Sequence, residues 1–342
     1  MEARPGDRDF VGISCGGVGD AGQVLDRAVE ARSEPGPLVL SEHDGPDRLP
    51  VASDPRIASR GSSWRYDRRM AHEAMTLLAE GRTAEVYAWG DGAILKLFRD
   101  WVPRDQAEHE AEVARAVSAS GLPVPWVGEI VDVDGRAGLV YERIDGPSLL
   151  DGFMKRPWTL RPTGLILARL HAELHKTHIA AAVPEQRRRL GRKIEQAGLL
   201  SSALRSRALE TLAGLPDGDV LCHGDFHPGN ILMTPSGPIV IDWIDATRGH
   251  PLADVARTFV IGRFGIPASG SLTQRVVRAC VNRLLGIYER EYGRQTGASH
   301  AEIAPWLPVV AAARIEEGVD EAGALAAYVE QSFAPSRKAT RR

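Results

Sequence analysis

The stretch from residue 221 to residue 245 places more constraints on this chain than any other. It begins with a short apolar run, and a polar loop follows. The loop carries four side chains that can bind metal ions or exchange protons, namely His223, Asp225, His227 and Asn230. A further carboxylate, Asp242, stands near the end of the stretch.

A small hairpin is predicted between Asn230 and Asp242. Residues 231–233 and 239–241 are two apolar runs, and the Pro-Ser-Gly sequence between them favours a turn. If the turn is centred on its serine, Asn230 lies across from Asp242. Mg²⁺ prefers oxygen ligands and is bound by one or two side chains, while phosphate and water complete its shell. The stretch therefore predicts a magnesium site, with Asp225 close by.

These residues resemble the catalytic segment of the protein-kinase-like superfamily, in its aminoglycoside phosphotransferase and choline kinase branch. There the loop reads H-G-D-x-H-x-x-N and the metal-binding aspartate stands in I-D-W. Both patterns are complete here, in residues 223–230 and 241–243. The resemblance covers residues 74–333 and implies an α+β, bilobal protein-kinase-like fold, with a small antiparallel β N-lobe carrying one helix and a mostly α C-lobe.

The resemblance also implies roles for individual residues. Asp225 would accept or orient the proton of an acceptor hydroxyl, and Asn230 and Asp242 would hold Mg²⁺ beside the phosphates of ATP. His223 would support the loop. Asp254 matches the aspartate of the family's G-x-P-x-x-D-x-A, which braces the loop by hydrogen bonds; an acid in the first turn of a helix also favours the helix dipole.

The nucleotide half is predicted from residues 75–143. Strands are expected at 75–79, 84–89, 93–98, 127–133 and 137–143, and a helix at 103–120. Lys96 lies in an apolar strand, where a charge is costly unless it is paired, so we expect Glu110 in the helix to be its partner. By resemblance this pair would hold the α- and β-phosphates. The alternative is that Lys96 snorkels to solvent from an edge strand.

Two further nucleotide contacts are predicted. The turn at residues 81–84 can offer backbone N–H groups to phosphate oxygens, which makes Gly81 and Thr83 candidates. By resemblance, backbone groups from Tyr141 to Ile144 would contact adenine.

The second lobe is predicted to be helical at residues 162–178, 184–196, 199–213, 251–264, 272–292, 300–316 and 319–333. His171, His175 and His178 share one helix face, which is typical of a packing helix more often than of a zinc site. The acidic residues 316–321 favour a helix start with Asp320 as N-cap, although they could instead line a pocket for a cationic acceptor.

The domain boundaries follow from composition. Residues 1–70, rich in Gly, Pro and Ser, are predicted to be a disordered leader, residues 71–145 the nucleotide-binding lobe, 146–335 the catalytic and acceptor-binding lobe, and 336–342 a frayed tail. The leader contains a GxGxxG at residues 17–22, but no further strands follow to build a dinucleotide-binding sheet. We therefore expect its deletion to be harmless.

Composition excludes several classes. A net charge of −3 gives no argument for nucleic acid or an anionic membrane as a partner. No apolar run reaches the roughly eighteen residues of a membrane span. The three cysteines have no metal-ligand spacing, so reduced thiols and a cytoplasmic location are expected.

The sequence thus predicts an ATP- and Mg²⁺-dependent kinase for a hydroxyl group of a small molecule. The acceptor stays open among aminoglycosides, choline, homoserine and sugar amines. A catalytically silent, nucleotide-binding regulatory protein is the alternative, and the oligomeric state is undetermined.

Overall fold

The structure is a computed structural model, and it describes residues 75–81, 83–179, 183–266 and 271–334. The described chain divides into two compact units. One contains the described residues up to Arg156 together with Pro228–Ile244, and the other contains Pro157–His227 and the described residues from Asp245 onward. The predicted leader, its glycine motif and the predicted tail lie outside the described residues, and the domain boundaries stay predictions.

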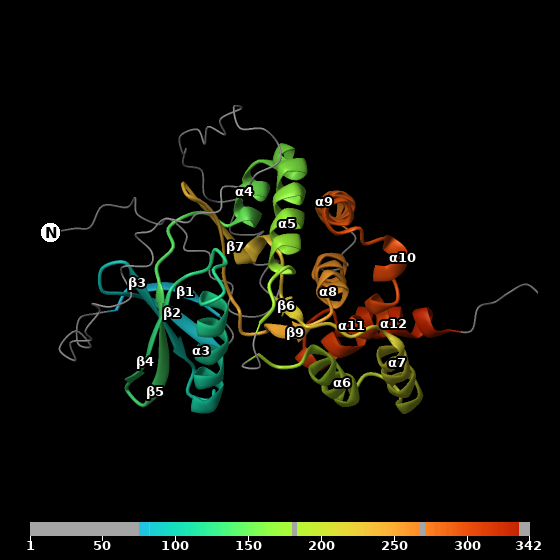
Figure 1. Cartoon of the computed structure of the whole chain (residues 1–342), viewed down its shortest axis with the longest axis horizontal. Coiled ribbons are helices and arrows are strands. Elements are labelled where there is room, and N and C mark those ends of the chain that lie inside the picture. Colours follow the sequence, from blue (N-terminus) through green and yellow to red (C-terminus); the bar gives the residue numbers. More distant parts are fainter. Residues whose placement is uncertain (1–74, 82, 180–182, 267–270, 335–342) are drawn as a thin grey trace, which may run out of the picture. The chain divides into compact units, whose positions relative to one another are not determined.

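The first unit is built on a five-stranded antiparallel sheet with the order β1-β2-β3-β5-β4. A single long helix, α3 (Arg104–Ser118), lies alongside β4 and β5 (Figure 1). The strands are β1 (Leu77–Glu80), β2 (Ala84–Trp89), β3 (Ala93–Phe98), β4 (Val127–Val133) and β5 (Arg136–Glu142). The predicted bounds of β2, β3 and β4 are confirmed.

The central position of β3 explains its composition. All six of its residues are buried, because β2 and β5 flank it and both faces of the sheet are covered there. The helix contributes alanines to this core, and Ala107 and Ala111 pack with Phe98 and Leu139. Small residues on a helix let its backbone approach the sheet closely, which holds α3 and β3 in fixed relation.

The predicted hairpin is present in the first unit. Its strands are β7 (Ile231–Thr234) and β8 (Gly237–Val240), and the short 3₁₀ helix η5 (Pro228–Asn230) leads into them. The register pairs Ile231 with Val240, and the Ile241 N–H donates to the Asn230 carbonyl at 3.0 Å. The prediction that Asn230 faces Asp242 is therefore wrong by one residue, because two residues rather than three form the turn. The helix α4 (Leu149–Lys155) packs near this hairpin.

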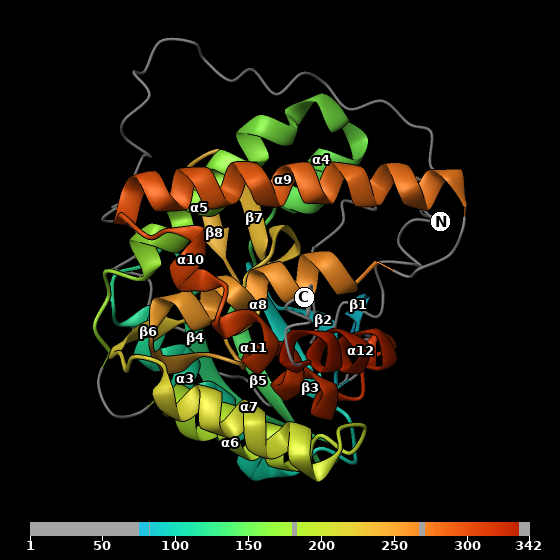
Figure 2. The same cartoon turned by 90° about the vertical axis from the view of Figure 1, so that its right-hand side faces the viewer.

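The second unit is mostly helical. The longest helix, α9 (Leu272–Thr296), runs alongside α5 (Leu160–Leu174), as Figure 2 shows. A Cβ at Gly164 would come within 2.8 Å of Ile287, so the two helices meet closely at this glycine. The remaining helices are α6 (Gln186–Gln196), α7 (Ser202–Gly214), α8 (Pro251–Phe264), α10 (His300–Ile303), α11 (Trp306–Arg314) and α12 (Ala322–Phe333), and β6 (Val220–Cys222) pairs with β9 (Thr247–Gly249).

Several helix predictions need correction, and one of them is the helix predicted at 162–178, which runs from Leu160 to Leu174. The helix predicted at 300–316 is divided into α10, α11 and a 3₁₀ turn, η6 (Ile315–Glu317), because Pro305 stands at the start of α11 and cannot continue a preceding helix. The helix predicted at 272–292 continues to Thr296 and ends at Gly297, whose φ of 81° is the left-handed conformation of a C-terminal glycine. The N-cap of α12 is Glu321, not Asp320.

Candidate active site

In the first unit, Lys96 and Glu110 form a buried ion pair. The Lys96 Nζ lies 2.7 Å from the Glu110 Oε1 and 3.7 Å from the Asp242 Oδ1, and the Tyr141 hydroxyl donates to the same Glu110 oxygen at 2.9 Å. Lys96 is 5% exposed and Glu110 2%. Because β3 has a neighbour on each side, Lys96 does not stand on an edge strand, and that alternative is wrong.

A cavity of about 610 Å³ opens beside this pair. Lys96, Glu110 and Asp242 supply charge on its wall, and Tyr141 and Ile144 also line it. The rest of the wall is largely apolar, with Ile94, Ala114, Val124, Pro125, Val127, Leu232, Ile241 and Trp243. An apolar wall with a few charged groups at one place suits a ligand with a flat ring and a charged tail.

The open end of the hairpin brings Asn230 and Asp242 into the same region of the first unit. Asn230 is fully buried, and the hydrogen bond from Ile241 fixes its backbone. Asp242 has a φ of 63°, a left-handed conformation that is uncommon for a residue with a Cβ and is tolerated best by Asn and Asp. One amide oxygen and one carboxylate make a donor set that fits a hard cation.

The turn at residues 81–84 is only partly available to a phosphate. The Gly81 N–H donates to the Ala84 carbonyl at 2.8 Å, and the Arg99 side chain donates to the Gly81 carbonyl. The backbone N–H of Gly81 is therefore engaged within its own hairpin, which corrects the expectation that it points to a ligand. The role of Thr83 stays a prediction.

In the second unit, the loop after β6 is held by Asp254 of α8. The Asp254 carboxylate accepts the His223 N–H at 2.5 Å and the Gly224 N–H at 2.8 Å. The same helix holds the other side of the loop, because the Arg257 Nε donates to the Gly224 carbonyl at 3.0 Å and the Thr258 hydroxyl donates to the Phe226 carbonyl at 2.8 Å. The backbone on both sides of Asp225 is thus fixed by one helix.

Asp225 itself is buried and ionised. It is 5% exposed, and its Oδ2 lies 3.5 Å from the His227 Nε2. Burial raises the pKa of Asp225, but the hydrogen bond and charge of His227 and the charges of Arg257 and Arg314 outweigh it and hold the pKa well below its usual range. The carboxylate of Asp225 is therefore ionised at neutral pH and can accept a proton.

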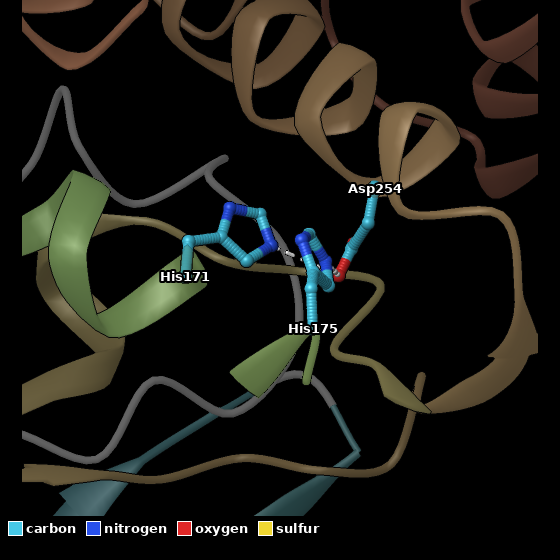
Figure 3. A group of neighbouring side chains, drawn as sticks. All are labelled: His171, His175 and Asp254. Carbon is cyan, nitrogen blue, oxygen red and sulfur yellow. Dashed lines mark hydrogen bonds and ion pairs between the residues drawn. The ribbon is translucent and has the colours of Figure 1, made fainter. Parts of the chain in front are cut away.

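His171 of α5 and His175, the C-cap residue of that helix, meet Asp254 of α8, as Figure 3 shows. The His171 Nε2 and the His175 Nε2 lie 3.0 and 3.3 Å from the Asp254 Oδ2. Their Nδ1 atoms lie 2.7 Å from the Tyr288 hydroxyl and 2.8 Å from the Tyr292 hydroxyl. An ionised carboxylate only accepts, so each Nε2 donates to Asp254.

This buried chain of hydrogen bonds uses both nitrogens of each ring. The three atoms that face one another could also surround a metal ion, since they all lie within 4.8 Å. Burial lowers the pKa of His171 to about 3, so its ring is neutral. Burial raises the pKa of Asp254, but its bonds to His171 and His175 hold it well below its usual range. The neutral ring of His171 and the ionised Asp254 satisfy one another, while His178 is exposed and takes no part.

Comparison with known proteins shows the family to which this chain belongs. The model of the phosphotransferase enzyme family matches residues 74–306, which include both halves of the site. The chain belongs to the phosphotransferase enzyme family. A search of curated proteins finds no significant match.

Solved structures support the fold of this family member. An amicoumacin kinase, in complex with AMP-PNP, Ca²⁺ and Ami, is 17% identical with a TM-score of 0.51, over 78% of this chain and 93% of that one. A putative fructosamine-3-kinase from Haemophilus somnus 129PT is 12% identical with a TM-score of 0.53, over 76% of this chain and 91% of that one. The predicted α+β, bilobal protein-kinase-like fold is confirmed.

Sequence reasoning missed a cluster of charges in this phosphotransferase. The Glu317 carboxylate accepts hydrogen bonds from Nη1 and Nη2 of Arg257, each at 2.8 Å. It also accepts from Lys193 at 2.7 Å and from Arg314 at 3.2 Å. Burial raises the pKa of Glu317, but these cations lower it to about 2. Within the acidic stretch 316–321, the side chains of Glu317 and Glu321 thus bind arginines, and Glu321, although it stands at the N-cap position of α12, makes no side-chain capping bond. These contacts could not be predicted from residue spacing, because Arg257 and Glu317 are 60 residues apart in the sequence.

The two tyrosines were missed as well, although a signal exists. His171 of α5 and His175, the C-cap residue of α5, are four residues apart, and Tyr288 and Tyr292 are four residues apart on α9. Matching polar pairs on two otherwise apolar helix faces indicate that the helices lie side by side.

Among the described helices, none is both long and apolar enough to cross a membrane.

Proposed function

We propose that this phosphotransferase moves the γ-phosphoryl group of ATP to a hydroxyl group of a small acceptor and requires Mg²⁺. The observation that carries the proposal is the buried Lys96–Glu110 pair with Asp242 beside it, on the wall of one largely apolar cavity. The family match supports phosphoryl transfer. The similar amicoumacin kinase, solved with AMP-PNP and Ca²⁺, supports a nucleotide and a divalent cation.

The first unit would bind the nucleotide. Lys96 supplies a positive charge for the α- and β-phosphates, and Glu110 keeps its ammonium group in place. The apolar wall would cover the adenine, with backbone groups from Tyr141 to Ile144 as hydrogen-bonding partners. Thr83 would contact a phosphate from the turn above.

Asn230 and Asp242 would hold the metal ion. When bound, Mg²⁺ neutralises charge on the phosphates and orients them for transfer. The left-handed backbone at Asp242 directs a carboxylate toward Lys96, 3.7 Å away, so one acid can serve both the ion and the lysine.

Asp225 would act on the acceptor. An ionised carboxylate beside a hydroxyl orients it and accepts its proton, a contribution of roughly 10² to 10⁴ in rate. Asp254 and the backbone of His223 would keep this carboxylate in place, because a loop that is free to move would lose the alignment on which transfer depends.

The test measures ADP release with ATP and, in parallel, with GTP, across aminoglycosides, amino alcohols, sugar amines and hydroxy acids. We expect ADP release that depends on one class of acceptor and on Mg²⁺, and a phosphorylated acceptor detected by mass spectrometry. Tight Mg²⁺-ATP binding without phosphorylation of any acceptor would favour the silent regulatory protein. The cytoplasmic location and the lack of a nucleic-acid partner stay predictions from composition.

A further inference from the structure

The Tyr141 side chain connects β5 to the buried ion pair of the first unit. Its hydroxyl donates to the Glu110 Oε1 at 2.9 Å, and the Lys96 Nζ donates to the same oxygen at 2.7 Å. All three residues line the cavity of about 610 Å³. We propose that the Tyr141 hydroxyl is a positioning group, which holds the Glu110 carboxylate and through it keeps the Lys96 ammonium directed at the nucleotide phosphates. This inference rests on the proposed function, in which Lys96 contacts the α- and β-phosphates.

The Glu110 carboxylate depends on these two donors. Its Oε1 accepts both bonds, and its Oε2 is buried and has no hydrogen-bond partner among the described residues. Glutamate and lysine both have long, flexible side chains, so a bond between their two ends alone leaves the pair able to move together. Loss of the Tyr141 hydroxyl would leave the carboxylate bonded to Lys96 alone.

A second acid competes with Glu110 for the ammonium group of Lys96. The Asp242 Oδ1 lies 3.7 Å from the Lys96 Nζ, against 2.7 Å for the Glu110 Oε1. Asp242 would also serve the metal ion in the proposed function, which leaves Glu110 as the acid that sets the position of Lys96. A Glu110 carboxylate that Tyr141 fixes therefore keeps the positive charge at one place in the cavity.

Tyr141 is itself firmly placed. Its backbone lies between two neighbouring strands, across from Ile94 on β3 and from Val127 on β4. Its ring packs against the core cluster that contains Leu139. A tyrosine side chain has few torsions, so a packed ring presents its hydroxyl at a defined point at a low entropic cost. The hydroxyl thus joins the sheet to α3, the helix from which Glu110 extends.

A purely structural role for the hydroxyl makes a different prediction. If the hydroxyl only joins the helix to the sheet, its removal lowers stability and affects every ligand of the cavity alike. If it positions Lys96, its removal weakens the binding of phosphates and spares the binding of the base, because the ammonium acts on the phosphates. Adenosine, which has no phosphate, therefore separates the two roles when it is compared with ADP and ATP.

The test compares wild type with Tyr141→Phe, which removes the hydroxyl and keeps the ring. Isothermal titration in the presence of Mg²⁺ measures the Kd of adenosine, ADP and ATP, and ADP release measures turnover. We expect the Kd of adenosine to stay within about twofold of wild type. The Kd of ADP and that of ATP should each rise by roughly tenfold, the effect of losing one hydrogen bond to a charged group.

Tyr87→Phe is the matched control. The Tyr87 hydroxyl donates to the Glu85 carboxylate at 3.1 Å on the neighbouring strand β2, and Tyr87 does not line the cavity. This variant loses the same kind of bond from the same sheet. It should leave the Kd of all three ligands unchanged.

Glu110→Gln tests whether the hydroxyl acts through the carboxylate. In that background Tyr141→Phe should raise the Kd of ATP by no more than about twofold, because the charge that the hydroxyl holds is already gone. A further rise of about tenfold there, equal losses for adenosine and ATP in Tyr141→Phe alone, or an unchanged Kd of ATP would overturn the inference, as would a wild type that binds no nucleotide. If the phosphates are lost selectively but no acceptor releases ADP, the inference stands and the proposed kinase function fails.

Discussion

Replacing Asp254 by Asn tests how the catalytic loop is held. The two side chains have the same shape, but the amide has one acceptor oxygen where the carboxylate has two. Asp254 is 1% exposed and accepts four hydrogen bonds, from the His223 and Gly224 N–H groups at 2.5 and 2.8 Å and from His171 and His175 at 3.0 and 3.3 Å. In the variant at least one donor faces the amide NH₂, and the other bonds lose their charge.

The expected cost follows from these bonds. A buried donor without a partner costs roughly 1–3 kcal/mol, and a bond to a charged group contributes about 1 kcal/mol more than a neutral one. Asp254→Asn should therefore lower the free energy of unfolding by about 4 kcal/mol, a large part of the roughly 5–15 kcal/mol of a typical protein. At temperatures where the variant is folded, kcat should fall because Asp225 is displaced, while nucleotide binding by the first unit should persist.

Urea unfolding followed by circular dichroism measures the stability, and ADP release measures kcat. Asp219→Asn is the control, because Asp219 is an exposed acid that lies 3.4 Å from His178 on the surface, and it should change stability by less than about 0.5 kcal/mol. A loss below about 1 kcal/mol in Asp254→Asn, or an unchanged kcat, would refute the claim that Asp254 holds the loop.

Three further predictions concern the buried charges. Lys96→Met should abolish nucleotide binding and destabilise the protein by roughly 3–5 kcal/mol, because it leaves Glu110 without its cation; adding Glu110→Gln should restore stability but not binding, and restored binding would contradict the assignment. Asp242→Asn keeps the left-handed backbone but should weaken Mg²⁺-dependent nucleotide binding, measured by titration at several Mg²⁺ concentrations; an unchanged Mg²⁺ requirement would remove Asp242 as a ligand. Lowering the pH from 7 to 5.5 should reduce the free energy of unfolding by about 1 kcal/mol, because His171, with a folded pKa of about 3, binds its proton only in the unfolded state, whose pKa is near 6.5; stability that is flat over this range in urea titrations would argue against neutral, buried His171.

Local patterns in the sequence predicted most elements of the sheet. Strands β2, β3 and β4 are bounded by glycine or proline turns, and their alternating or continuous apolar character leaves few other choices. The helix predicted at residues 300–316 was misjudged because its apolar periodicity runs through Pro305. The hairpin register was misjudged by one residue because a Pro-Ser-Gly turn allows either two or three residues in the loop.

The nucleotide half of the site could be predicted because the position of one charged residue limits where its partner can stand. A lysine in an apolar strand needs an acid, and the following helix offers Glu110. The acceptor half could not be predicted in the same way. The contact of His171 with Tyr288 spans 117 residues and that of Arg257 with Glu317 spans 60, so both depend on how the helices pack. The side-chain partners of Glu317 and Glu321 could not be predicted either, because Arg257 and Arg314 are brought to them by the packing of the helices.

Asp225→Asn tests the central claim most directly. Wild type and variant are compared for ADP release with the best acceptor of the panel and for Mg²⁺-ATP binding by titration. The proposed mechanism predicts that the variant loses turnover by roughly 10² or more while its nucleotide affinity stays within about twofold of wild type. Full turnover in Asp225→Asn would contradict the account, because no role in the transfer would then remain for the carboxylate that the loop, Asp254 and α8 hold in place.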